Sequence, residues 1–211
     1  MFSLSYFLDL LYSLPGIFIA ISFHEMAHAY AADSMGDPTP KQAGRLTVNP
    51  LKHMDYLGFL CMLVMHFGWA KPVPINPNNF KDRRKGIILV SLSGVFTNLL
   101  LAFITMPVYY FVILQGGNEI LETIIQYIFS YNVVFAVFNI LPIPPLDGSN
   151  VLAEFLPPKA KQTYLKFSRY SIYVMILLMF LGVFSLIISP IANGIITLFG
   201  NFWSFIFGLF L

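Results

Sequence analysis

Long apolar runs dominate this chain and leave few architectures open to it. They cover residues 4–32, 56–70, 86–114, 120–141, 170–188 and 191–211. Five of the six are long enough to cross a hydrocarbon core, which takes about 17 to 25 helical residues. Only 10% of the residues are charged, against about a quarter in soluble domains, so polar side chains are too few to cover a water-facing surface. Because backbone groups in lipid must pair within their own segment, we expect an all-α polytopic membrane protein with about five transmembrane helices.

The apolar run at 56–70 is too short to span in the usual way, and the basic residues indicate its course. All 12 Lys and Arg fall in three stretches, at 41–52, 71–85 and 159–169. Basic short loops mark the cytoplasmic side of a membrane. If the short run dips in and returns, all three stretches face the cytoplasm, whereas a full crossing puts the first two on opposite sides. We therefore expect a re-entrant segment, with the N-terminus outside and the C-terminus inside.

Two polar stretches flank this predicted re-entrant segment. Residues 45–49 alternate polar and apolar side chains, as a half-exposed strand does. Pro72, Pro74 and Pro77 confine the second stretch to extended backbone or to a sheet edge. We expect a small membrane-surface β-sheet here, within a single membrane-embedded domain that covers residues 1–211.

A His-Glu-x-x-His pattern, from His24 to His28, lies inside the first apolar run. Ionisable side chains are costly in hydrocarbon, so those that occur there indicate a functional site. Residues four apart lie on one face of a helix, so the two imidazoles can hold one metal ion with Glu25 beside them as a base. Asp33 marks the cytoplasmic end of the run, which places the pattern roughly 7 to 14 Å below the surface at 1.5 Å per residue.

A third ligand is needed, because a catalytic zinc usually keeps three protein ligands and one open position. Asp147 is the leading candidate, since the prolines just before it place irregular chain in the same half of the membrane as the histidines. The alternative for Asp147 is to cap a helix that begins near Ser149. His53 and His66 are weaker candidates, the first as an interfacial residue and the second as a hydrogen-bonded wall residue.

Further motifs follow one another between about residue 20 and residue 155. They are His24-Glu25-x-x-His28, Gly44-Arg45-Leu46-Thr47-Val48-Asn49-Pro50-Leu51-Lys52-His53, Gly68-Trp69-Ala70-Lys71-Pro72-Val73-Pro74-Ile75-Asn76-Pro77, Ser93-Gly94-x-x-x-Asn98, and the stretch from Asn139 to Gly148. In these motifs the chain resembles the site-2 proteases, a family of intramembrane zinc metalloproteases. The His-Glu-x-x-His pattern alone is a weak signal, but its combination with Leu-Asp-Gly 119 residues later is specific.

The resemblance implies a set of site residues. One zinc ion per chain is expected on His24, His28 and Asp147, with Glu25 as the catalytic base. Asn139 is expected to hold the substrate carbonyl or the developing oxyanion. The alternative for Asn139 is a buried amide that bonds to a neighbouring helix.

Two positions differ from the usual family pattern. Asp55 is followed by Tyr56, and Gly94 is followed by Val95, where the family usually has proline. Both differences bear on the path of the re-entrant backbone more than on metal binding. For Asn98 we prefer a role in helix packing, because small and polar residues join membrane helices. In length the chain resembles the compact form of the family, without a PDZ or CBS domain.

The function expected from these residues is that of an intramembrane zinc metalloprotease. It would hydrolyse peptide bonds in or near transmembrane helices of membrane-protein substrates, by zinc-activated water with Glu25 as general base. Two other classes stay open: a transporter whose buried His and Glu carry ions, and a membrane adaptor that binds client helices without cutting them. Basic stretches with at most five Lys and Arg indicate contact with the lipid bilayer and not with nucleic acid. We expect a prokaryotic plasma membrane with the active site toward the cytoplasm, while the natural substrate and the oligomeric state stay open.

Overall fold

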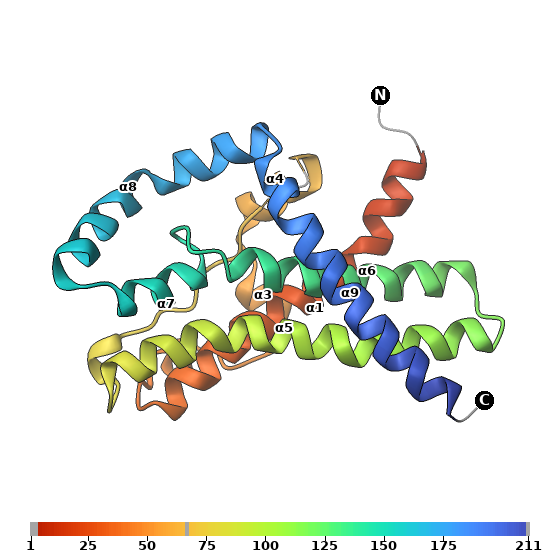
Figure 1. Ribbon diagram of the computed structural model, residues 1–211, viewed down its shortest axis with the longest axis horizontal. Coiled ribbons are helices and arrows are strands. Elements are labelled where there is room, and N and C mark those ends of the chain that lie inside the picture. Colours follow the sequence, from red (N-terminus) through yellow and green to blue (C-terminus); the bar gives the residue numbers. More distant parts are fainter. Residues whose placement is uncertain (1–3, 66–67, 210–211) are drawn as a thin grey trace.

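The computed structural model describes residues 4–65 and 68–209, which are mostly helical (Figure 1). In chain order the helices are α1 (Leu4–Ser34), α2 (Thr39–Gln42), α3 (Pro50–His53), α4 (Tyr56–Met65), the 3-10 turn η1 (Pro77–Asn79), α5 (Arg83–Leu114), α6 (Glu119–Asn139), α7 (Asp147–Phe155), α8 (Pro158–Phe180) and α9 (Val183–Gly208). The expectation of an all-α architecture is confirmed for this part of the chain.

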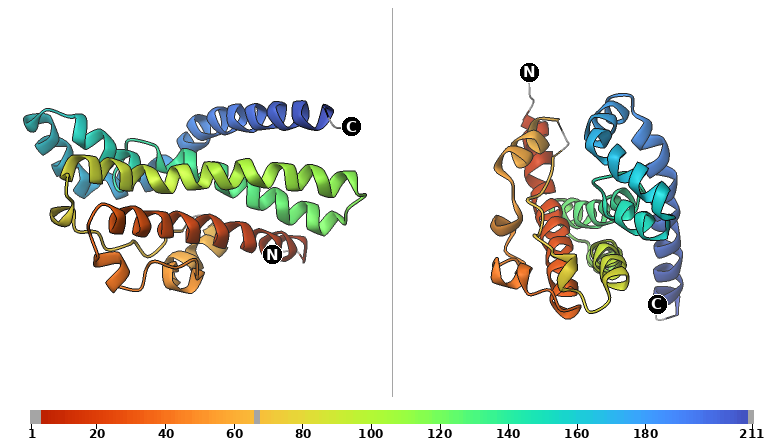
Figure 2. Two further views of the ribbon diagram at one scale, coloured as in Figure 1. Left: turned by 90° about the horizontal axis from the view of Figure 1, so that it is seen from below. Right: turned by 90° about the vertical axis from the view of Figure 1, so that its left-hand side faces the viewer.

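Three long helices, α1, α5 and α6, pack against one another and form the centre of the molecule (Figure 1, Figure 2). Helix α9 packs on α5 and α6, where Ala102, Val133 and Ala192 belong to one buried apolar cluster. Small residues let the helices approach closely. A Cβ added to Gly16 of α1 would lie 2.8 Å from the carbonyl carbon of Tyr127 in α6. The bundle is therefore held by close backbone packing as well as by apolar side chains.

Four of the described helices, α1, α5, α6 and α9, are long and apolar enough to cross a membrane. We expected about five, and the predicted span at 170–188 does not form a single helix. Helix α8 ends at Phe180, Gly182 adopts a left-handed φ of 68°, and α9 begins at Val183. Glycine takes this backbone conformation without strain, so the apolar run is divided between two helices.

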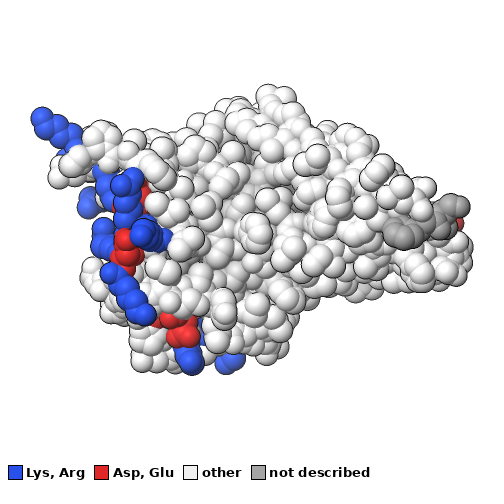
Figure 3. Space-filling view, turned by 60° about the horizontal axis from the view of Figure 1, so that its bottom comes forward, with Lys and Arg blue, Asp and Glu red and all other residues white. Residues whose placement is uncertain are grey.

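Lysine and arginine side chains gather at one end of the bundle (Figure 3). On the face shown in Figure 3, Lys and Arg form a band with Asp and Glu among them, and the long middle of that face carries no charge. Ion pairs join some of these residues, including Lys41 with Asp33 at 3.7 Å and Lys161 with Glu154 at 2.7 Å. This distribution agrees with the expectation that the basic stretches face one side of a membrane.

The expected membrane-surface β-sheet is not seen among the described residues. Residues 45–49 bend instead of extending, and the amide of Thr47 donates to the carbonyl of Arg45 at 2.9 Å. Residues 71–76 are extended, but two of their six positions are prolines without an N–H to give to a ladder. No sheet forms in this part of the described chain because a local turn bends residues 45–49 and because the prolines of residues 71–76 lack N–H donors.

The two ends of the predicted re-entrant segment lie side by side. Met54 and Ala70 form an isolated antiparallel bridge, and the amide of Lys71 donates to the carbonyl of His53 at 2.8 Å. Helix α4 fills the first part of the interval, and residues 66–67 lie outside the described chain. The segment therefore leaves from and returns to one place in the fold.

Candidate metal centre

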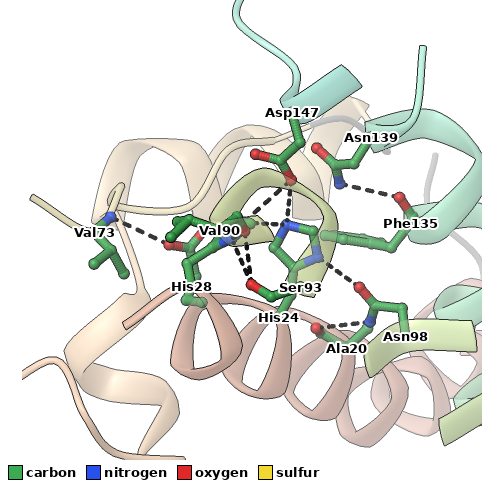
Figure 4. A network of polar contacts seen from close by, with 11 residues as sticks. Ala20, His24, His28, Val73, Val90, Ser93, Asn98, Phe135, Asn139 and Asp147 are labelled. Atoms are coloured by element: carbon green, nitrogen blue, oxygen red, sulfur yellow. Dashed lines mark hydrogen bonds and ion pairs between the residues drawn. The ribbon is translucent and has the colours of Figure 1, made fainter. Parts of the chain in front are cut away.

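His24 and His28 project from the same face of α1, one turn apart, into the protein interior (Figure 4). Their side chains are buried, and their ring centroids are 4.6 Å apart. The two Nε2 atoms are separated by 3.0 Å. The helical spacing of the sequence pattern therefore brings both imidazoles to one point.

Asp147 reaches the same point from another part of the chain. It is the first residue of α7, after the irregular segment at 140–146. Its Oδ2 lies 3.0 Å from Nε2 of His24 and 3.1 Å from Nε2 of His28. The N-cap of α7 is Leu146 and no side chain caps this helix, so the alternative role of a helix cap is not seen.

Two glycines allow the surrounding backbone to come close enough. A Cβ added to Gly148 would lie 2.0 Å from the carbonyl oxygen of Ile140, so only glycine lets α7 start against the end of α6. A Cβ added to Gly94 of α5 would lie 2.6 Å from Cε1 of His24. Both contacts are far shorter than van der Waals distance, so each glycine makes room for the site.

Hydrogen bonds from α5 set the tautomers of the two histidines. Nδ1 of His24 donates to Oδ1 of Asn98 at 2.6 Å, and Nδ1 of His28 donates to the carbonyl of Val90 at 2.7 Å. A carbonyl oxygen only accepts hydrogen bonds, so the hydrogen of each neutral ring sits on Nδ1. Each Nε2 then presents a free lone pair toward Asp147.

With both rings neutral, three electron-rich atoms face one another: Nε2 of His24, Nε2 of His28 and Oδ2 of Asp147. Oδ2 of Asp147 is buried and receives no hydrogen bond. A tetrahedral zinc with ligands at about 2.0 to 2.1 Å keeps neighbouring ligand atoms about 3.3 Å apart, close to the 3.0 and 3.1 Å found here. Among the described residues this is the one group of His, Cys, Asp or Glu found with spacing suited to a metal ion. The donor set and its spacing fit a divalent cation such as zinc.

The two side chains expected to be catalytic have different surroundings. Glu25 lies next to His24 in α1, and its Oε2 accepts a hydrogen bond from the amide of Val73 at 3.2 Å. Asn139 ends α6 and lies beside Asp147 in Figure 4, with its amide nitrogen donating to the carbonyl of Phe135 at 3.0 Å. The Asn139 amide is thus satisfied within its own helix in this conformation.

Comparison with known proteins identifies the family of this chain. A family model described as Peptidase family M50 matches residues 115–182, which include Asp147. A protein of Bacillus subtilis named "Putative zinc metalloprotease YwhC" is 36% identical over 189 residues, covering 87% of this chain and 86% of the relative. The chain belongs to peptidase family M50. Two mycobacterial proteins named "Putative zinc metalloprotease Rip2" are also similar to this peptidase. The one from Mycolicibacterium smegmatis is 27% identical over 172 residues (79% of this chain, 65% of the relative), and the one from Mycobacterium tuberculosis is 26% identical over 187 residues (86% and 68%).

Membership in the M50 family confirms the resemblance to site-2 proteases that the motifs indicated. The chain is therefore a metalloprotease, and the four membrane-length apolar helices found among its described residues, together with the family, point to an integral membrane protein. No solved structure matches it.

A chain of buried amides supports the first histidine of this M50 peptidase. Asn98 accepts from His24 and donates to the carbonyl of Ala20 at 3.0 Å and to Oδ1 of Asn132 at 2.8 Å. Asn132 in turn donates to the carbonyl of Ile128 in its own helix at 2.8 Å. Asn98 thus packs helices, as we expected, and also orients a ring, which we did not foresee. The sequence feature that could have indicated this role is the presence of two amide side chains, Asn98 and Asn132, within two apolar runs.

Replacing Asn98 with leucine is expected to lower the affinity for zinc by about 10- to 100-fold. The leucine leaves Nδ1–H of His24 without its acceptor, and loss of such a partner typically costs that much. Competition with a chromogenic chelator on the purified protein measures the affinity. Thr105→Val is the control, because it removes a bond within α5, from Thr105 to the carbonyl of Leu101. Equal affinities of the wild type and the Asn98 variant would contradict the prediction.

The two weaker candidates for the third ligand do not join the cluster in the described structure. His53 is fully buried, and its Nε2 bonds to the carbonyl of Thr47 at 2.7 Å. His66 lies outside the described residues. The close group consists of His24, His28 and Asp147.

Proposed function

We propose that this chain is an intramembrane zinc metalloprotease that hydrolyses peptide bonds in or near transmembrane helices of membrane-protein substrates. One observation carries the proposal: Nε2 of His24, Nε2 of His28 and Oδ2 of Asp147 meet within 3.1 Å of one another, inside a bundle of membrane-length helices. Relatives named as zinc metalloproteases support zinc as the metal. In this proposal residues 1–211 form a single protease domain with one zinc ion.

Each proposed site residue has its own task. His24, His28 and Asp147 would hold zinc, which when bound activates water near neutral pH and polarises a peptide carbonyl. Glu25 takes the proton of the attacking water and passes it to the leaving amine. Asn139 donates a hydrogen bond to the oxygen on which negative charge grows, once its amide nitrogen turns away from its own helix.

The proposal includes a placement in the membrane. We infer that residues 56–70 are re-entrant, because the bridge between Met54 and Ala70 joins the two ends of that segment. The end of the bundle that carries the lysine and arginine side chains would then face the cytoplasm, following the rule for basic loops. The histidines lie five to nine residues before Asp33 and would sit in the cytoplasmic half of the bilayer. The named relatives are bacterial, which favours a prokaryotic plasma membrane.

The buried position of the site limits what it can cut. His24 is 5% exposed and His28 is 7% exposed, so a substrate must open a path to reach them. A peptide bond within a helix is shielded by side chains, and its carbonyl already accepts a hydrogen bond. The proposed substrates are therefore membrane proteins whose transmembrane helix unwinds locally before cleavage.

Metal removal from the reconstituted chain tests this function. The purified protein in lipid vesicles is expected to cleave a model single-span substrate, to stop when a chelator strips the metal, and to recover when zinc is added back. Cleavage products are followed by gel and mass spectrometry. Vesicles that bind the substrate but never cut it would favour an adaptor. Ion flux that continues after metal removal, without cleavage at any stage, would favour a transporter.

A further inference from the structure

Residues 71–76, which we call the strap, run as extended chain past the proposed base. The amide of Val73 donates to Oε2 of Glu25 at 3.2 Å. The neighbours of Val73 in sequence, Pro72 and Pro74, have no N–H, so Val73 carries the one donor in this part of the strap. Val73 is 8% exposed, so this residue of the strap packs against the body of the protein.

A buried arginine holds the first end of the strap. Arg45 is 5% exposed, and its guanidinium donates to the carbonyls of Lys52, Lys71 and Pro72, the last at 2.8 Å. No ion pair with a carboxylate is found for Arg45 among the described residues. Burying a charge is costly unless its hydrogen bonds are met. The two terminal nitrogens of the guanidinium bind backbone carbonyls on both sides of the predicted re-entrant segment, including those of the two residues before Val73, while Nε is buried and has no partner among the described residues.

A buried carboxylate holds the other end. Asp37 is fully buried, and its Oδ2 accepts from the amide of Asn76 at 2.7 Å. Its Oδ1 accepts from Nδ2 of Asn79 at 2.7 Å and from the amide of Thr39 at 3.1 Å. Burial raises the pKa of Asp37, but the hydrogen bonds it accepts outweigh burial, so its pKa lies below the usual range. The carboxylate stays ionised and anchors the strap just after α1.

We propose that Arg45 and Asp37 are positioning residues that hold the two ends of the strap, so that the amide of Val73 keeps the carboxylate of Glu25 in place. Neither residue is near enough in sequence to act on Glu25 locally, and each binds a different end of one extended segment. This inference rests on the proposed role of Glu25 as base. It adds two charged residues, outside the ligand set, on which the rate of cleavage depends.

Steady-state kinetics of reconstituted variants test the inference. Arg45→Gln is expected to lower kcat by about 10- to 100-fold, since misplacing a catalytic group by about 1 Å costs up to that much. Asp37→Asn is expected to lower kcat as well. KM and zinc content should stay near those of the wild type, because no ligand is touched. Lys41→Gln is the control, because it removes a cation from the same basic stretch whose side chain makes a surface ion pair.

A double-mutant cycle separates positioning from general loss of structure. Val73→Pro removes the N–H that binds Glu25 but suits the extended backbone between two prolines. If Arg45 acts through that contact, the two substitutions are not additive. The double variant Arg45→Gln with Val73→Pro should then have a kcat no lower than that of the more impaired single variant. Additive losses, an unchanged kcat, or a loss that follows zinc content would overturn the inference.

Two further arms keep the test decisive. If Arg45→Gln does not fold, the cycle is run with Asp37→Asn and read by the same criteria. Glu25→Gln in the same preparation separates the two proposals. Full cleavage by that variant would remove the proposed role of Glu25 as base and this inference with it, whereas an inactive Glu25 variant with an additive cycle would remove this inference alone.

Discussion

Replacing Asp147 with alanine is expected to remove both the metal and the cleavage activity. Oδ2 of Asp147 is the one carboxylate oxygen found beside the histidine pair in the described chain, and without it two neutral imidazoles remain. Catalytic zinc sites need three protein ligands, so zinc content should fall from one per chain toward zero. Because metal polarisation is worth several kcal/mol at the transition state, cleavage should fall by about 10³-fold or more. Metal analysis of the purified protein and cleavage rates in vesicles measure the two effects.

A matched control separates this effect from the loss of any acidic residue near the site. Asp33→Ala removes a carboxylate at the end of α1 that makes a half-exposed ion pair with Lys41 at 3.7 Å. Such surface pairs contribute little to stability, so zinc content and cleavage should be unchanged. An Asp147→Ala protein that keeps one zinc and its activity would end the ligand assignment.

Replacing Glu25 with glutamine is expected to lower kcat by about 10²- to 10⁴-fold while zinc stays bound. Glutamine has the shape of glutamate but cannot take a proton from water, and general base catalysis contributes a factor of this size. The amide oxygen of glutamine still accepts from Val73, so the local structure should persist. Initial rates with a single-span substrate, together with zinc content, measure the outcome.

The Asp147 and Glu25 variants are expected to differ in zinc content, and this difference distinguishes a metal ligand from a base. Loss of Asp147 should remove the metal and the rate together, whereas loss of the Glu25 carboxylate should remove the rate alone. A Glu25→Gln protein that lost its zinc would mean that this residue helps to hold the metal. Wild-type rates in that variant would mean that another group takes the proton.

Local patterns predicted the parts of this protein that depend on a single helix. The apolar runs predicted α1, α5 and α6, because a helix of that length and polarity has few alternatives in lipid. The spacing of His24 and His28 predicted their contact, because helical periodicity alone places residues four apart on one face. Asp147 needed more: its place in the proposed ligand set came from topology and from the family resemblance.

Predictions failed where a local pattern had to specify an interaction with another segment. The alternation at 45–49 suits a strand, but a strand also needs a partner, and the following stretch lacks donors at its prolines. The apolar run at 170–188 satisfied the length rule, but Gly182 divides it into two helices.

What the sequence determined by itself was an all-α membrane protein with a His pair and an adjacent glutamate on one helix, because these follow from periodicity and polarity over a few turns. Only the tertiary structure decided that Asn98 orients His24 and that Arg45 and Asp37 bind the two ends of the strap. Those contacts join side chains to groups 27 to 74 residues away, through the packing of several segments at once. No repeat or spacing along the chain specifies such a meeting, because its geometry depends on every helix between the partners.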